Sequence, residues 1–368
     1  MKILHISGAK GWGGNEQQMV YLFPELQQKG VENSVFGVSD SVLQAECARL
    51  EIPFIVAKKH KLNLAVNYRY LKEVVLKIKP DLIHLHTSDS LTVFTISDIL
   101  FGLKTKAVFS KKGMGTSSSF LSKIKYNYSG LNSIICVSKS VQRDLGAILS
   151  SKNKLKTTVI HDCVSLTIQK ELPTFSIREK FSIPAEIKLV GNIGNHAKAK
   201  DLTTFIETVS VILNQFDRKD ILFVQIGEFS KLTPDLMELI KTKKVEKNIL
   251  FLNKIEKASS VVPQFDVFLM TSEREGGPTS VLEAMLMGVP VVSTQVGVVP
   301  EVIKPGENGL FAPVKEANLL ATHVIEMLDN ELLHQKCSQN ARELIQKEFN
   351  SNVIANQTKT LYEQLIQS

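Results

Sequence analysis

Two glutamates flank a glycine–proline turn in the segment Glu275-Gly276-Gly277-Pro278-Thr279-Ser280-Val281-Leu282-Glu283. The apolar run Val267–Met270 precedes this segment and is typical of a buried strand. Pro278 suits the first position of a helix, because its missing N–H and fixed φ cost nothing there. Gly288 suits the end of the same helix. The sequence therefore predicts a strand, a glycine-rich loop and a helix that runs to about Met287.

The start of this helix is predicted to bind an anion. The backbone N–H groups of Thr279 and Ser280 have no partner within a helix, and the helix dipole adds positive charge there. Glu283 lies four residues after Thr279 on the same face, and Glu275 lies just ahead of the helix. Carboxylates accept hydrogen bonds from sugar hydroxyls. A diphosphate would thus have a carboxylate on either side; the alternative is an ordinary strand–loop–helix unit with two solvated glutamates.

Two segments in the first half place flexible or reactive residues after an expected strand. Gly11-Trp12-Gly13-Gly14-Asn15-Glu16 follows the strand Lys2–Ser7, and its glycines allow the backbone to approach a ligand closely. In the strand of Asp81–Thr87, alternation puts His84 and His86 on one face, with His86 at the carboxyl end. His86 thus lies at the end of the strand where a ligand site would be, whereas His84 lies deeper, where a structural role is expected. A plain turn and a structural His86 are the alternatives.

A lysine follows the first strand of the second half. That strand begins at Ile187, and Lys198-Ala199-Lys200-Asp201 comes after it. An ammonium group beside a diphosphate would neutralise the charge that grows on a leaving group. Lys200 and Lys198 are the candidates for this role, while a solvated lysine at a helix start is the ordinary alternative.

The elements that must position these residues alternate in both halves of the chain. Apolar β-branched runs are followed by amphipathic stretches, which predicts parallel sheets with helices on both faces. We expect two Rossmann-like doubly wound domains, over residues 1–165 and 187–349, with 166–186 as a connector. The helix of residues 350–368 is expected to return to the first domain. In such domains ligands bind beyond the carboxyl ends of the strands.

Composition excludes several classes of protein. The 368 residues are 43% hydrophobic and 22% charged, close to globular averages. No apolar run approaches the ~20 residues that span a bilayer, and the amino terminus reads as a buried strand rather than a signal peptide. The four cysteines form no C-x-x-C pair, so neither a disulfide framework nor a zinc site is expected. These features favour the cytoplasm.

Positive charge is concentrated in the first half. Residues 1–165 contain 22 Lys and Arg against 12 Asp and Glu, and no carboxylate lies between Asp98 and Asp144. A basic surface attracts anions such as phosphorylated ligands, lipid head groups or nucleic acid. No aromatic stacking ladder or known motif supports nucleic acid, so that partner is not expected. An ordinary solvated surface is the alternative.

The glutamate segment resembles the E-x7-E signature of retaining family 4 glycosyltransferases with the GT-B fold, in which two Rossmann-like domains face each other across a cleft. The similarity continues through Ala284–Val292 and Gly297–Glu301. It implies that Glu275 contacts the donor sugar, that Glu283 binds the ribose of a nucleotide, and that amides near Thr279 and Ser280 bind phosphate. The resemblance implies catalytic residues His86, Lys200 and Glu275, and donor-binding residues Gly13, Gly14, Gly191, Asn192, Lys200, Glu275, Gly276, Gly277, Pro278, Thr279, Ser280 and Glu283.

This chain departs from the family pattern at several positions. Asn192 stands where an arginine is usual, and Asp201 where a glycine commonly follows the lysine. Ser110-Lys111-Lys112 replaces a T-x-H, and Asp162-Cys163-Val164-Ser165 replaces an N-G-V-D. The lysines suggest that the part of the first domain that binds the acceptor substrate favours anions. Its candidate residues are Glu16, Lys111 and Lys112.

The resemblance implies transfer of a hexose-type sugar from a nucleotide-diphosphate donor with retention of configuration, and the expected donor is a UDP-sugar. No Asp-x-Asp occurs, so neither a metal nor a cofactor beyond the nucleotide sugar is expected. The acceptor is expected to be a glycan or a lipid-linked precursor of surface polysaccharide or lipopolysaccharide. The alternatives are a non-catalytic protein that binds a glycan or a partner, and a nucleotide-sugar epimerase.

A stretch of the first domain, residues 101–128, resembles the membrane-docking region of related enzymes. Phe120, Leu121, Ile124 and Tyr128 recur at helical spacing, with Lys123 and Lys125 between them. Apolar and basic residues on one face favour an anionic interface. We expect a peripheral position on the inner face of the cell membrane, with an ordinary core-facing helix as the alternative.

Overall fold

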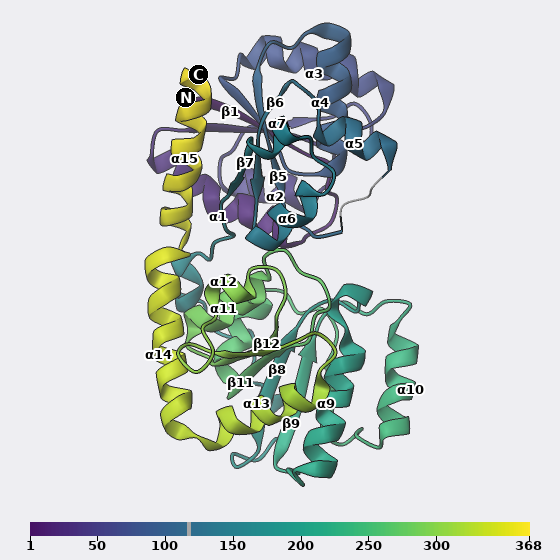
Figure 1. Ribbon diagram of the computed structural model, residues 1–368, viewed down its shortest axis with the longest axis vertical. Coiled ribbons are helices and arrows are strands. Elements are labelled where there is room, and N and C mark those ends of the chain that lie inside the picture. Colours follow the sequence, from purple (N-terminus) through teal and green to yellow (C-terminus); the bar gives the residue numbers. More distant parts are fainter. Residues whose placement is uncertain (116–118) are drawn as a thin grey trace. The chain divides into compact units, whose positions relative to one another are not determined.

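Two parallel sheets carry the alternating pattern of the sequence. The structure, a computed structural model, describes residues 1–115 and 119–368 (Figure 1). The chain divides into a first unit, Met1–Cys163 with Ser351–Ser368, and a second unit, Val164–Asn350. All four cysteines are buried free thiols.

The first unit is built on a seven-stranded parallel sheet with the strand order β3-β2-β1-β4-β5-β6-β7. Its strands are β1 (Lys2–Ser7), β2 (Glu32–Gly37), β3 (Phe54–Val56), β4 (Leu82–Leu85), β5 (Lys106–Lys111), β6 (Leu131–Cys136) and β7 (Thr157–Val159). Its helices are α1 (Gly14–Gln28), α2 (Val42–Arg49), α3 (Ala65–Ile78), α4 (Ser88–Phe101), α5 (Phe120–Tyr126), α6 (Lys139–Gly146), α7 (Ser151–Lys154) and α15 (Ser351–Gln367).

Helices cover both faces of this sheet. Apolar residues of α3, α4 and α6 form one core with the sheet, and α1, α2 and α15 cover the other face. The last helix, α15, packs against α1 (Figure 1). The strand order reverses between β1 and β4, so the carboxyl ends of these two strands are the switch point where ligands bind in such sheets.

The second unit has a six-stranded parallel sheet with the order β10-β9-β8-β11-β12-β13. Its strands are β8 (Lys188–Ile193), β9 (Ile221–Ile226), β10 (Ile249–Leu252), β11 (Val267–Met270), β12 (Val291–Thr294) and β13 (Leu310–Ala312). Its α-helices are α8 (Ile177–Lys180), α9 (Leu202–Gln215), α10 (Thr233–Lys243), α11 (Thr279–Met287), α12 (Val299–Val302), α13 (Ala317–Asp329) and α14 (Glu331–Glu348), with 3-10 turns η1 (Leu166–Lys170), η2 (Lys198–Lys200) and η3 (Ala258–Gln264). The switch point here lies between β8 and β11.

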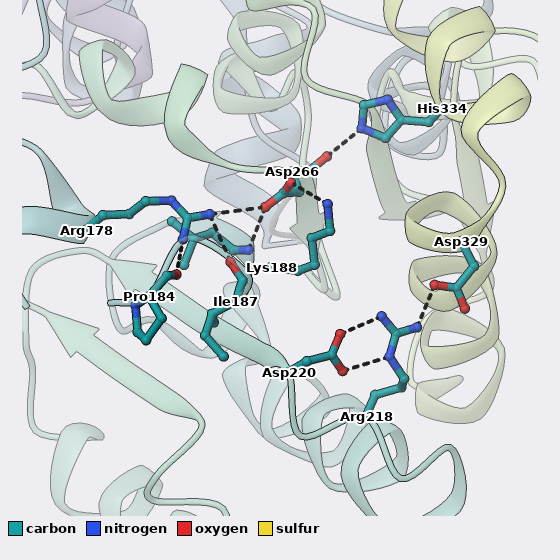
Figure 2. A network of polar contacts seen from close by, with 10 residues as sticks. Arg178, Pro184, Ile187, Lys188, Arg218, Asp220, Asp266, Asp329 and His334 are labelled. Carbon is teal, nitrogen blue, oxygen red and sulfur yellow. Dashed lines mark hydrogen bonds and ion pairs between the residues drawn. The ribbon is translucent and has the colours of Figure 1, made fainter. Parts of the chain in front are cut away.

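Residues 166–186 belong to the second unit rather than forming a separate connector. Figure 2 shows the reason: Asp266, just before β11, accepts hydrogen bonds from the Leu189 amide at 2.7 Å and the Lys188 ammonium at 3.5 Å. The guanidinium of Arg178 lies 3.9 Å from the same carboxylate and donates to the carbonyls of Pro184 and Ile187. These contacts attach α8 to the amino-terminal edge of the sheet.

The same edge is held at a second point. Arg218 donates two hydrogen bonds to Asp220 at 2.8 and 2.9 Å and a third to Asp329 at 2.6 Å (Figure 2). This links the start of β9 to the end of α13. Both networks lie opposite the carboxyl ends of the strands, so they stabilise the unit without occupying the predicted ligand side.

Two predicted helices differ from the structure. Pro278 is the residue before α11 rather than its first residue, because its ψ of 95° is extended. The helix expected over 350–368 begins at Ser351, because the chain is not helical at Phe349 and Asn350, between α14 and α15. There the Val164 amide donates to the Phe349 carbonyl at 2.9 Å, and Val164 bridges Asn350. The backbone at Phe349 and Asn350 therefore pairs with Val164 instead of continuing the helix.

Candidate active site

The two loops at the switch point of the second unit bring Lys200 and Glu275 together. The ammonium of Lys200 lies 2.6 Å from Oε1 of Glu275. The backbone fixes this meeting, since the amides of Glu273 and Arg274 both donate to the carbonyl of Ala199, at 2.8 and 3.2 Å. About a quarter of the Lys200 side chain remains exposed, at 27%, so the pair is open to a ligand.

Ser272 also binds Glu275, a role that the sequence did not indicate separately. Its buried hydroxyl donates to Oε1 of Glu275 at 2.9 Å, and Thr294 donates to the Ser272 carbonyl at 2.6 Å. The only available signal was its place directly after a buried strand, where the carboxyl edge of a sheet begins. Glu275 is therefore fixed by a cation and a hydroxyl before any ligand is bound.

The start of α11 is not capped by a side chain, and Thr279 and Glu283 are buried there. Gly297 approaches this loop closely: its φ is +56°, and an added Cβ would lie 2.5 Å from the Gly276 carbonyl oxygen. Only glycine fits at position 297 without displacing the turn at Gly276. The loop and helix start are thus placed by backbone packing, with Gly276 and Gly277 leading into Pro278.

Gly191 and Asn192 serve the interior of the sheet. A Cβ on Gly191 would lie 2.0 Å from the ring of Phe265. The buried amide of Asn192 donates to the Leu269 carbonyl at 2.8 Å and accepts from Gln225 at 3.4 Å. The side-chain amide of Asn192 thus joins β8 to its neighbours, and a contact of Asn192 with the donor stays a prediction.

The residue after Lys200 shows why this position commonly holds glycine. Asp201 has φ +44° and ψ +56°, a left-handed conformation that favours glycine. Its carboxylate accepts from the Thr204 amide at 3.3 Å and from the Thr204 hydroxyl at 2.7 Å. Capping of α9 offsets the backbone strain, which explains how aspartate replaces glycine here.

In the first unit, the glycine-rich loop is attached to the end of β4. Helix α1 begins at Gly14, and Asn15 donates from Nδ2 to the His86 carbonyl at 2.8 Å. Glu16 is buried, burial raises the pKa of its carboxyl, and an added Cβ on Gly13 would lie 3.3 Å from its Oε2. The loop after β1 and the end of β4 therefore form one local structure at the switch point.

Three buried histidines, His5, His84 and His86, lie beneath this loop. Their candidate ligand atoms are within 4.8 Å of one another. His5 bonds His86 and Asn33, while His84 bonds Ser110 at 2.8 Å and Tyr362 of α15 at 2.5 Å. Both ring nitrogens of His5 and of His84 are already in hydrogen bonds, so this is a polar network rather than a ready metal site. His84 has the deeper position expected of it.

The lysines after β5 do not present two charges to an acceptor. The Lys112 ammonium forms an ion pair with Asp162, which is buried. The Lys111 ammonium donates to the Gly113 carbonyl, and burial lowers its pKa. In the structure a buried carboxylate that the sequence did not connect with Lys112 balances its charge, and the expectation that this side favours anions stays a prediction.

Solved structures show which class of fold this is. The chain superposes on HepE of Anabaena, solved with UDP and glucose, with a TM-score of 0.84, 18% identity and coverage of 99% and 100% of the two chains. It also matches the sucrose-phosphate synthase of Thermosynechococcus elongatus, with a TM-score of 0.81, 19% identity and coverage of 100% and 99%. The two doubly wound units are the two domains of a GT-B fold.

The particular family follows from sequence. The family described as glycosyltransferase family 4 matches residues 12–167, and that described as glycosyl transferases group 1 matches residues 174–344. The chain belongs to the group 1 glycosyltransferases.

Individual relatives are distant. The N-acetyl-α-D-glucosaminyl L-malate synthase of Bacillus anthracis is 24% identical over 298 residues, which are 79% of this chain and 77% of that protein. The O-antigen biosynthesis glycosyltransferase WclY of Escherichia coli is 27% identical over 51% of this chain and 50% of that protein.

Proposed function

We propose that the protein transfers a hexose-type sugar, with retention of configuration, from a nucleotide-diphosphate donor of the UDP type. The observation that carries the proposal is the contact of Lys200 with Glu275 beside the uncapped start of α11. A cation, free backbone donors and a carboxylate at one switch point fit the diphosphate and the sugar of such a donor. Glu283 is placed on the first turns of α11, where it would bind the ribose.

Lys200 and α11 have the charge that the departing group requires. The bond between the anomeric carbon and the diphosphate oxygen breaks, and the electron pair stays on the nucleoside diphosphate. Lys200 would exchange Glu275 for a phosphate oxygen, which frees Glu275 for a sugar hydroxyl. The acceptor hydroxyl attacks from the face that the leaving group vacates, and its proton passes to a phosphate oxygen. We propose that no metal takes part, since ammonium and helix amides occupy that role.

The choice of donor and acceptor is based on the proteins that this chain resembles. HepE was solved with UDP and glucose, and the relatives include a glycosyltransferase of O-antigen biosynthesis. We therefore propose a UDP-sugar donor and a glycan or lipid-linked acceptor in the assembly of a surface polysaccharide or lipopolysaccharide.

Release of nucleoside diphosphate from a panel of nucleotide sugars tests the enzyme directly. We expect slow hydrolysis of one UDP-sugar without acceptor, unchanged by EDTA, and an α-linked product from an α-linked donor by proton NMR coupling. Binding of a nucleotide sugar without any release would instead indicate a non-catalytic binding protein. An inverted product would contradict the retaining mechanism, and loss of activity in EDTA would contradict the metal-independent one.

We also propose peripheral contact with an anionic membrane through α5. No helix of the described chain is long and apolar enough to cross a bilayer. Phe120 and Leu121 are each 76% exposed, so this apolar face of α5 is turned to solvent rather than to the core. Tyr128 is not part of that face, because its hydroxyl bonds Asp98 at 2.8 Å. Likewise the Lys125 ammonium bonds Ser88.

Flotation with vesicles separates this contact from chance adhesion. We expect binding to vesicles with anionic lipid, loss of binding at high salt, and loss in a Phe120→Ser/Leu121→Ser variant that keeps its hydrolysis of the donor. Equal binding of this variant and the parent protein would exclude α5 as the docking element.

A further inference from the structure

A chain of hydrogen bonds runs from Asn33 through His5 to His86 at the end of β4. We propose that His5, oriented by Asn33, fixes the ring of His86 in the tautomer whose Nδ1 accepts a hydrogen bond from a substrate hydroxyl. His5 is then a positioning residue that acts through His86. The inference rests on the proposed function, because it takes a sugar hydroxyl as the group that His86 receives.

The chain begins at Asn33, whose orientation is set by the backbone. Its Nδ2 donates to the Val31 carbonyl at 3.4 Å, which leaves Oδ1 directed at Nε2 of His5, 3.0 Å away. An amide oxygen can only accept. The proton on the His5 ring therefore lies on Nε2.

The hydrogen bond between His5 and His86 then determines the tautomer of His86. Burial lowers the pKa of His5 to about 4, so the ring is neutral at physiological pH and its Nδ1 has no proton. Nδ1 of His5 lies 2.9 Å from Nε2 of His86, and the two rings are stacked with an interplanar angle of 26°. Since His5 can only accept at Nδ1, His86 must donate from Nε2.

The remaining nitrogen of His86 is then an acceptor. Burial and the neighbouring His84, His5 and Lys112 lower the pKa of His86, so a second proton on its ring is disfavoured. With Nε2 protonated, Nδ1 carries a lone pair. A protonated or opposite tautomer would present an N–H there and would suit a different ligand group.

A second buried acceptor lies at the same strand end. Asn15 donates from Nδ2 to the His86 carbonyl, and its buried Oδ1 has no hydrogen-bond partner in the described part of the chain. Buried polar atoms are nearly always paired in native proteins, so an orphan acceptor indicates a ligand or water that donates. Two acceptors at one switch point, Nδ1 of His86 and Oδ1 of Asn15, fit two hydroxyls of a sugar, each of which donates one hydrogen bond.

The tautomer can be read without any assay of activity. Long-range proton–nitrogen correlation spectra of the full chain labelled with ¹⁵N-histidine distinguish protonated from unprotonated ring nitrogens, and a His86→Gln variant assigns the signals. We expect His86 and His5 both to be protonated at Nε2 in the parent protein. A proton on Nδ1 of His86 would overturn the proposal.

Two substitutions of similar size at Asn33 separate positioning from packing. Asn33→Gln keeps a neutral amide acceptor for His5 and should retain the His86 tautomer, whereas Asn33→Leu removes that acceptor and should produce a mixture. We expect kcat to fall on the order of tenfold in Asn33→Leu, the effect of one lost hydrogen bond, with Asn33→Gln closer to the parent. Equal kcat losses with an unchanged tautomer in both would contradict the proposal.

A double-mutant cycle shows whether His5 acts through His86. His5→Leu should lower kcat in the parent protein but have no further effect in a His86→Ala background, because its only route is already removed. The same additional loss in both backgrounds would make His5 merely structural. If His5→Leu does not fold, the two Asn33 variants and the ¹⁵N-histidine spectra still show whether His5 sets the tautomer of His86. Failure of all nucleotide sugars to react would overturn the proposed function, while the tautomer would remain testable.

Discussion

Lys200 and Glu275 form an ion pair with the ammonium 2.6 Å from Oε1, although they are 75 residues apart in the chain. The pair is made by two loops that follow β8 and β11, the neighbouring strands at which the sheet order reverses. In the absence of donor each group satisfies the other. Under the proposed function, donor binding would exchange this contact for contacts with phosphate and sugar.

Removal of either member of the pair should strongly reduce turnover. We expect Lys200→Ala and Glu275→Ala each to lower the rate of nucleoside diphosphate release about 100-fold or more, since removal of one preorganised charged group at a reaction centre has that effect. Lys198→Ala is the matched control, because Lys198 is exposed in the same 3-10 turn. Near-parent rates in both variants would remove these residues from the catalytic site.

Loss of the Ser272 hydroxyl should weaken catalysis more than folding. Ser272→Ala deletes the 2.9 Å bond to Glu275 but leaves the ion pair, so we expect kcat to fall about tenfold. Ser210→Ala, on α9, is the control. Steady-state rates with the preferred UDP-sugar and the melting temperature should be measured together. A drop in melting temperature with an unchanged kcat would show that Ser272 only supports the fold.

Gly297 and Gly306 allow close approach and backbone strain to be separated. Both have positive φ, but an added Cβ at Gly306 meets no atom within 4 Å, whereas at Gly297 it meets the Gly276 carbonyl. We expect Gly306→Ala to lower the free energy of unfolding by about 1–2 kcal/mol, the cost of a left-handed alanine. Gly297→Ala should lower it further and also raise the KM for donor. Urea unfolding and donor titration measure both, and matching KM values would contradict the role of Gly297.

Acid should destabilise the protein through the buried histidines. The pKa of His5 is about 4 when folded and about 6.5 when unfolded. Below pH 6.5 the unfolded chain binds a proton that the folded chain does not, so stability is complete above pH 6.5 and decreases as the pH falls towards 4. His5 accounts for about 3 kcal/mol of that loss, and the lowered pKa values of His84 and His86 add in the same direction.

Urea midpoints measured between pH 7 and pH 4.5 check this. His5→Leu should flatten the dependence on pH, while His60→Leu, at an exposed position, should leave the slope as it is in the parent protein. An equally steep slope in His5→Leu would show that other groups control the acid response.

Much of the fold was predictable because its signals are local. The strands Lys2–Ser7 and Val267–Met270 have the ends that the sequence predicted, and Gly288 ends α11 with φ +74°. The sequence also placed the start of the E-x7-E segment and Lys200 in loops that follow strands, where the structure has them. The hydrogen bonds that Asn192 makes to the strands beside β8 could not be predicted, because they depend on which strands flank β8.

Sequence alone predicted the two α/β halves and the glycosyltransferase class, and it led us to expect an anion site at the start of α11. The tertiary structure decided which distant residues meet: Lys200 with Glu275, Lys112 with Asp162, and His5 with His86. Periodicity and turn chemistry act over a few residues, so they fix helices and strands. Strand order is a property of the whole sheet, and only that order brings β1 beside β4 and β8 beside β11 and so places these side chains together.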